Sequence, residues 1–167
     1  MEKFFCKFAV KPDGNSLEGY AFYFDQVSTP ADYDWRGKKK FASGCKVNLK
    51  EPVFLLVEHD NRKKLASTNG GLNVFSSEKG LKVECENIAG TSLWADTKLL
   101  IQDETYTGLS CGFIPVISEY DEKKEIQTFK EIDLFDISIV GKSFMDSELK
   151  AMAKPKPLKR RPPEDFL

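Results

Sequence analysis

The sequence predicts a β-rich α+β domain with one or two flanking helices. Short segments rich in aromatic and β-branched residues alternate with clusters of turn-forming residues. Residues 91–102 are the best helical stretch, and the strand–helix alternation that implies a parallel sheet is absent. Of the 167 residues, 41% are hydrophobic, which is enough for one core. We therefore expect one domain over residues 1–153 and a separate tail over 154–167.

The N-terminal part is predicted to begin with a β-hairpin. Residues 4–10 and 17–24 carry aromatic and β-branched side chains, and the turn formers of residues 11–16 separate them. Residues 28–44 are polar and lack a strand's alternation, so we expect a long loop. Within it we expect a short helix near residues 38–42, with its run of lysines facing solvent.

The rest of the chain predicts further strands around one helix. An apolar run over residues 52–59 indicates a buried strand that ends at His59. Thr91 or Ser92 is placed to cap the helix over residues 91–102, whose apolar side chains recur at helical spacing. A second short helix is expected over residues 143–152. Residues 72–75 and 81–85 flank the turn formers of residues 76–80 and are a second hairpin candidate. The remaining predicted strands are residues 108–118, 125–131 and 134–140, with a turn over residues 120–124.

Composition argues against several classes of function. The 25 basic and 26 acidic residues nearly cancel, so no overall field favours nucleic acid or a membrane surface. The longest apolar runs are far shorter than the about 20 residues that span a bilayer. One histidine and no CxxC pair argue against a structural zinc site, and we expect neither metal nor cofactor.

The ends of the sequence carry further expectations. The first residues lack the apolar stretch of a signal peptide, so we expect the protein to remain where it is made, with its four cysteines as thiols. Residues 154–167 contain four prolines and five basic residues, a composition that forms no packed element. We predict a disordered, basic, proline-rich tail.

His59 is the first candidate for chemistry. It follows an apolar strand and precedes a charged turn, so its imidazole can be half-buried and still reach a cleft. Imidazole accepts and returns protons near neutral pH, which suits a general base. A lone histidine is more often structural, and this alternative stays open.

Ser110 is the candidate nucleophile. It lies in Gly108-Leu109-Ser110-Cys111-Gly112, where glycines let a substrate approach the backbone. Backbone N–H groups of Cys111 and Gly112 are candidate oxyanion donors. Strand residues follow the serine, so the strand–serine–helix elbow of α/β-hydrolases does not fit. Cys111 is the rival nucleophile, and on a strand its side chain faces the opposite way.

Three carboxylates follow in an otherwise apolar strand, at Glu131, Asp133 and Asp136. Buried carboxylates are costly unless they are paired, so one of them is a candidate to orient the histidine. Glu131 and Asp133 share one face, and Asp136 takes the other unless a bulge intervenes. The alternative is a set of solvent-facing acids on an edge strand.

Four stretches in this order resemble the caudovirus prohead protease family. They are Leu17-Glu18-Gly19-Tyr20-Ala21, Leu56-Val57-Glu58-His59-Asp60, Gly108-Leu109-Ser110-Cys111-Gly112-Phe113 and the strand from Lys130 to Val140. The family is similar to the herpesvirus assemblins, so the resemblance implies an assemblin-like β-barrel. In assemblins the third catalytic residue follows a Phe-Lys pair. Phe129-Lys130 therefore makes Glu131 the first choice for this role and Asp136 the second.

The resemblance implies a serine endopeptidase that cleaves scaffold or capsid-protein segments, and itself, inside the assembling prohead in the host cytoplasm. It leaves a homo-oligomer open, since assemblins act as dimers. The main alternative is a catalytically inactive capsid-assembly or scaffold module of the same fold. A cysteine hydrolase using Cys111 and a nucleic-acid-binding barrel are the other two.

Overall fold

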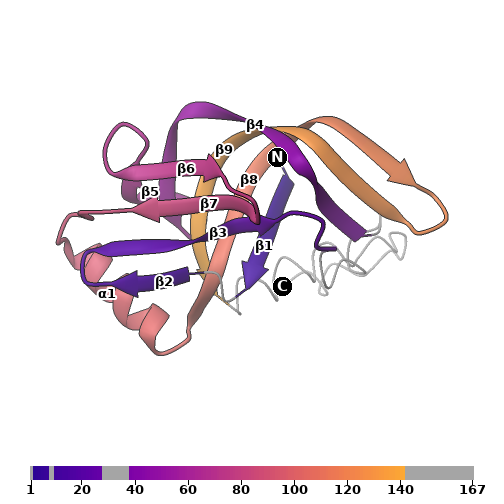
Figure 1. Cartoon of the computed structure of the whole chain (residues 1–167). Coiled ribbons are helices and arrows are strands. Elements are labelled where there is room, and N and C mark those ends of the chain that lie inside the picture. Colours follow the sequence, from indigo (N-terminus) through magenta and orange to yellow (C-terminus); the bar gives the residue numbers. More distant parts are fainter. Residues whose placement is uncertain (1, 8–9, 28–37, 142–167) are drawn as a thin grey trace, which may run out of the picture.

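The computed structural model describes residues 2–7, 10–27 and 38–141, which form nine strands and one helix (Figure 1). In chain order the elements are β1 (Glu2–Lys7), β2 (Val10–Asp13), β3 (Ser16–Tyr23), β4 (Lys38–Val57), β5 (Asp60–Ser67), β6 (Leu72–Ser76), β7 (Gly80–Cys85), α1 (Ser92–Gln102), β8 (Tyr106–Asp121) and β9 (Ile126–Gly141). The predicted β-rich α+β class is confirmed.

Two sheets make up the described part of the chain. The larger has the order β1-β8-β9-β4-β5 and the smaller β2-β3-β7-β6. Their strand orders end at β1 and β5 and at β2 and β6, so the described strands form two open sheets. The closed barrel that the resemblance implied is not found among them.

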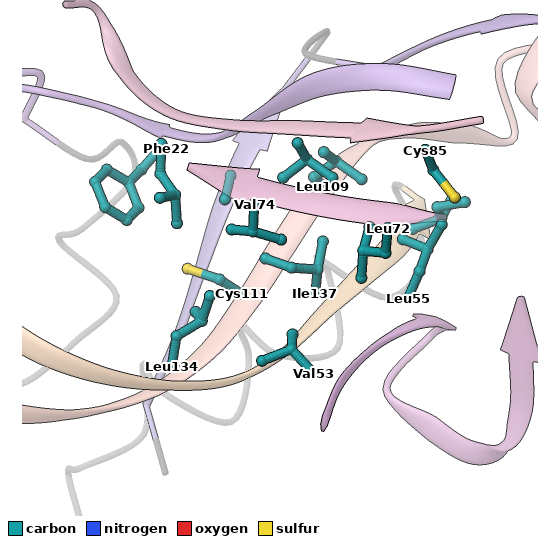
Figure 2. Close-up of a cluster of buried hydrophobic side chains, with 14 of the residues drawn as sticks. Phe22, Val53, Leu55, Leu72, Val74, Cys85, Leu109, Cys111, Leu134 and Ile137 are labelled. Atoms are coloured by element: carbon teal, nitrogen blue, oxygen red, sulfur yellow. The ribbon is translucent and has the colours of Figure 1, made fainter. Parts of the chain in front are cut away.

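The hydrophobic core lies between the two sheets (Figure 2). From the larger sheet it receives Leu55, Leu109, Cys111, Leu134 and Ile137, and from the smaller sheet Phe22, Leu72, Val74 and Cys85. We call this side of the larger sheet its inner face and the opposite side its outer face. Side chains alternate along a strand, so the residues between these core positions point to the outer face.

The predicted helix and the predicted hairpin over residues 72–85 are confirmed. The helix α1 begins after Thr91, whose hydroxyl accepts a hydrogen bond from the Trp94 N–H at 3.2 Å and so caps the first turn. Strands β6 and β7 pair antiparallel around the predicted turn of residues 76–80. The strand expected over residues 108–118 lies within β8, whereas the two strands expected over residues 125–131 and 134–140 form the single strand β9, which pairs antiparallel with β8. In each case local turn or cap chemistry agrees with the apolar pattern around it.

The predicted N-terminal hairpin is only half right. Strands β2 and β3 form a hairpin around Gly14, which has a φ of +63° that glycine adopts readily. Strand β1, however, leaves this hairpin and pairs with β8. Periodicity identifies a strand but not its partner, and β1 contributes Phe4 to the core as an edge strand of the larger sheet.

The short helix expected near residues 38–42 is wrong. Strand β4 begins at Lys38, and its first four residues pair with Ile126–Phe129 of β9. Lys39 is buried and forms an ion pair with Glu2 at 3.0 Å, so the lysine run does not lie wholly in solvent. The ion pair offsets the cost of burying the ammonium group, which the sequence pattern could not anticipate.

One parallel strand pair was also missed. Strands β4 and β9 pair in parallel over most of their length. Parallel neighbours need a long crossover connection, which is usually one helix. Here the connection passes through β5, β6, β7, α1 and β8, so no local strand–helix–strand pattern marks it.

The other predictions for the C-terminal part lie outside the described residues. These are the helix over residues 143–152, the tail over residues 154–167 and the domain limit at residue 153. In the part of the chain that the structure describes, α1 is too short to cross a membrane, and no other helix is present.

Candidate active site

His59 lies in the tight turn that joins β4 to β5. Val57 pairs with Asp60, so Glu58 and His59 are the two central residues of a two-residue hairpin. Their φ angles are +54° and +55°, as in the type I′ turns that match the twist of a hairpin. Neither is the glycine or asparagine that such turns favour, and left-handed backbone costs other residues on the order of 1–3 kcal/mol each.

Ser110 lies on β8 directly opposite Ser138 of β9. Its neighbours Leu109 and Cys111 are fully buried in the core between the sheets (Figure 2). Because side chains alternate along a strand, the Ser110 side chain points to the outer face. Ser110 itself is only 2% exposed. The nucleophile candidate therefore lies within the sheet, on its shielded outer face.

Asp136 reaches the same outer face because of a bulge in β9. Gly112 pairs with Asp136 while Phe113 pairs with Leu134, so Phe135 is the additional residue on the β9 side. The core positions of β9 change phase there, from Ile132 and Leu134 to Ile137 and Ile139. The bulge anticipated as an exception thus occurs, and the acids on both sides of it share one face.

The three side chains form a continuous hydrogen-bonded series. His59 Nε2 lies 2.8 Å from Ser110 Oγ, and His59 Nδ1 lies 2.7 Å from Asp136 Oδ1. The imidazole is 7% exposed and the Asp136 side chain 18% exposed. Such distances are typical of strong hydrogen bonds, and limited contact with water strengthens them.

The acceptor capacity of a carboxylate sets the proton positions in this series. When Asp136 is ionised it can only accept, so a neutral imidazole then carries its proton on Nδ1 and donates it to Asp136. Nε2 is then the unprotonated nitrogen and accepts from the Ser110 hydroxyl. This is the arrangement in which a histidine can remove the serine proton.

Glu131 lies in a different group of side chains. Asn48 Nδ2 donates to Glu131 Oε2 at 2.9 Å and to Asp133 Oδ1 at 3.0 Å, and Lys50 Nζ lies 3.8 Å from Asp133 Oδ1. In the sheet, Glu131 is opposite Ile117 and Lys46, whereas Asp136 is opposite Gly112 and Phe54. We call Asn48, Glu131 and Asp133 the amide–carboxylate cluster. The structure brings Asp136, and not Glu131, to His59.

Asp60 follows His59 directly but its side chain contacts Arg62. Asp60 Oδ1 accepts from the Arg62 backbone N–H at 2.9 Å and from Arg62 Nε at 3.1 Å. These hydrogen bonds and the guanidinium charge lower the pKa of the Asp60 carboxyl. The neighbouring acid in the sequence is thus paired with arginine.

The oxyanion candidates Cys111 and Gly112 lie inside the larger sheet. Cys111 is opposite Phe4 and Ile137, and Gly112 is opposite Lys3 and Asp136. Their backbones have a strand on each side, and the Cys111 side chain belongs to the core on the inner face. Cys111 therefore lies on the opposite face from His59, while the role of both backbone N–H groups stays a prediction.

Two contacts around the turn were not expected from the sequence. The backbone N–H of His59 donates to Ser138 Oγ at 2.7 Å, and the Tyr106 hydroxyl donates to Glu58 Oε1 at 2.7 Å. Burial, and then the bond to Glu58, raises the pKa of Tyr106 to about 12. Only Ser138 carried a signal, as a polar residue in an apolar run two positions after Asp136.

A hydroxyl, an imidazole and a carboxylate joined in series are the arrangement of serine hydrolases. The model of the family described as caudovirus prohead serine protease matches residues 7–154. The chain therefore belongs to this family of bacteriophage proteases, as the sequence motifs predicted.

One curated relative adds to this assignment. The protein named Prohead protease of Escherichia phage T5 is 26% identical over 95 residues. The alignment covers 56% of this chain and 41% of the phage T5 protein, so the chain spans less than half of that relative's length. No solved structure matches the chain significantly.

Proposed function

We propose that this chain is a serine endopeptidase whose catalytic residues are Ser110, His59 and Asp136. The observation that carries the proposal is the series of two hydrogen bonds, 2.8 Å from Ser110 Oγ to His59 Nε2 and 2.7 Å from His59 Nδ1 to Asp136 Oδ1. Membership of the family supports the proposal independently, because the match to the family depends on the sequence and not on these distances.

In this mechanism Ser110 Oγ attacks the carbonyl carbon of a peptide bond while His59 Nε2 takes the hydroxyl proton. His59 then gives that proton to the leaving amine, and water hydrolyses the acyl-enzyme by the same route. Asp136 keeps the Nδ1 proton in place and stabilises the imidazolium that forms. The chain order of the triad is histidine, serine and then the acid.

The third catalytic residue proposed here is Asp136, the second choice of the sequence analysis. Glu131 is supported only by its place after Phe129-Lys130, whereas Asp136 is within hydrogen-bond distance of the histidine. Glu131 also accepts from Asn48, which occupies its carboxylate in another contact.

The proposed substrates are the scaffold or a removable segment of the capsid protein, inside the prohead in the host cytoplasm. Self-cleavage and a homo-oligomeric form belong to the same proposal. This part rests on the family and on the name of the phage T5 relative, not on a groove in the structure.

The test is co-expression of the capsid and scaffold proteins of the same phage with the wild-type chain, followed by intact mass measurement of the products. We expect truncated capsid or scaffold protein with the wild type and full-length protein with Ser110→Ala. Ser118→Ala is the matched control, because Ser118 is an exposed serine farther along β8. We expect it to give the wild-type pattern.

A serine-directed fluorophosphonate probe distinguishes the two nucleophile candidates. We expect it to label the wild type and Cys111→Ala, but not Ser110→Ala. Full-length products in every co-expression, together with an unlabelled Ser110, would contradict the protease function.

A further inference from the structure

We propose that Ser138 is a positioning residue for the catalytic histidine, acting through the backbone of His59. The inference rests on the proposed function, because it assigns a role in the same site. It is carried by the hydrogen bond from the His59 backbone N–H to Ser138 Oγ, at 2.7 Å. Ser138 has no exposed surface, and it lies on β9 opposite Ser110.

The need for such a residue comes from the turn. Glu58 and His59 both have φ near +55°, in a turn whose sequence lacks the glycine or asparagine that would adopt it without strain. Strained backbone persists only where the surroundings hold it. Without an external contact, the turn would relax and change the direction of the imidazole.

Apart from the two bonds of the imidazole ring, three hydrogen bonds join this turn to described residues of β8 and β9. Glu58 N donates to the Ile139 carbonyl at 2.9 Å, Glu58 Oε1 accepts from the Tyr106 hydroxyl at 2.7 Å, and His59 N donates to Ser138 Oγ. Of these three, only the Ser138 contact acts on the residue that carries the base. It is also the contact nearest to the nucleophile, since Ser138 is opposite Ser110.

The spacing on β9 makes this contact specific. Asp136 and Ser138 are two residues apart on the same face, so one strand contacts both the ring and the backbone of His59. Asp136 fixes the ring nitrogen, and Ser138 fixes the point from which the ring projects. A small shift of the backbone would move Nε2 away from Ser110, and a displacement of about 1 Å can cost about 10²-fold in rate.

The test uses the fact that His59 is the only histidine of the chain. Labelling with ¹⁵N-histidine gives one imidazole signal set, from which NMR reads the tautomer without any substrate. We expect one neutral tautomer, protonated on Nδ1, in the wild type. In Ser138→Ala we expect a mixture of tautomers and a fall of about 10²-fold in the rate of Ser110 labelling by the fluorophosphonate probe.

The control is Thr68→Ala. Thr68 Oγ1 accepts from the Val53 N–H at 3.0 Å, which is the same kind of bond at the other end of the β4–β5 hairpin. We expect this variant to keep the wild-type tautomer and labelling rate even if it loses stability. Ser138→Thr, which keeps the hydroxyl, should restore both readouts.

Two outcomes would overturn the inference. One is a Ser138→Ala protein with the tautomer and labelling rate of Thr68→Ala. The other is an equal loss in Ser138→Ala and Ser138→Thr, which would assign the effect to packing. A wild type that the probe does not label would contradict the proposed function instead, and the tautomer would still decide the role of Ser138.

Discussion

The outer face of β9 carries two groups of carboxylates with different surroundings. Toward the end of the strand, Asp136 accepts from the imidazole that contacts Ser110. Five residues earlier, Glu131 shares the Asn48 amide with Asp133. The two groups lie on one strand and one face, so the difference comes from β4 and the turn after it. The side chains that neighbour each carboxylate therefore determine whether it contacts the histidine or the Asn48 amide.

The bulge at Phe135 makes the comparison possible. Without it, strict alternation would turn Asp136 and Ser138 toward the inner face, where Ile137 and Ile139 now complete the core. With it, the strand fills the core on one side and presents both acid groups on the other. Bulges are frequent beside active sites for this reason.

The largest expected difference between the two groups is in the rate of cleavage after one acid of each group is neutralised. We expect Asp136→Asn to lower the rate of cleavage by about 10⁴-fold, because an amide no longer holds the histidine in the required tautomer. We expect Glu131→Gln to stay within a few-fold of the wild type. Both rates are measured by intact mass in the co-expression assay or by fluorophosphonate labelling. A larger loss in Glu131→Gln would restore Glu131 as the third catalytic residue.

The same comparison shows what the sequence could and could not predict. Local patterns predict Ser110 and His59 as candidates: a serine between glycines and a histidine at the end of a buried strand. In the structure Ser110 lies on a strand and His59 lies in the turn that follows one. The partner of His59 was not local. It depends on a parallel pairing of β4 with β9, which leaves no mark in the periodicity. It also depends on one additional residue at Phe135, which the sequence admits only as an exception to the alternation.

The pairing of strands that lie far apart in the chain cannot be predicted from the sequence for a similar reason. The β6–β7 hairpin is predicted from the sequence because its turn is short and its two strands are adjacent in the chain. Strand β1 pairs with β8, about 100 residues later in the chain, through contacts that no local signal specifies. The polar side chain of Ser138 interrupts an apolar run, but this pattern does not show which group the hydroxyl contacts, so it assigns no role to Ser138.

The next prediction tests the amide–carboxylate cluster as a structural element. Asn48→Ala removes the donor that Glu131 and Asp133 share, and leaves two partly buried carboxylates without it. We expect the free energy of unfolding to fall by about 1–3 kcal/mol, measured by urea denaturation, with unchanged fluorophosphonate labelling. Asn73→Ala, at an exposed position of β6, is the control and should change neither. A loss of labelling in Asn48→Ala would mean that the two groups are coupled.

A smaller effect is expected at the turn that carries His59. Tyr106→Phe removes the bond to Glu58 and should lower the free energy of unfolding by about 1–2 kcal/mol at pH 7. The pKa of Tyr106 is about 12 in the folded protein against an ordinary value of 10.0. The folded state therefore holds this proton more tightly, and the associated stability is present below pH 10 and lost as the pH rises toward 12.

The pH dependence is measured as the difference between the wild type and Tyr106→Phe, because the buried Cys45 and Cys85 thiols also have raised pKa values. We expect the two unfolding free energies to converge between pH 10 and 12. A difference that stays constant over this range would mean that the Tyr106 hydroxyl is not held by Glu58.

The smallest expected effect concerns the Cys45 thiol beside the amide–carboxylate cluster. Burial, and then the charge of Glu131, raises the pKa of Cys45 to about 11 from an ordinary 9.0. Because the thiolate is the reactive form, Glu131→Gln should increase the rate of Cys45 alkylation at pH 9, by less than about tenfold since burial remains. Asp136→Asn should leave this rate unchanged, as mass spectrometry of the alkylated peptide would show. Equal changes in both variants would mean that the two acid groups share one electrostatic environment, and the distinction between them would fail.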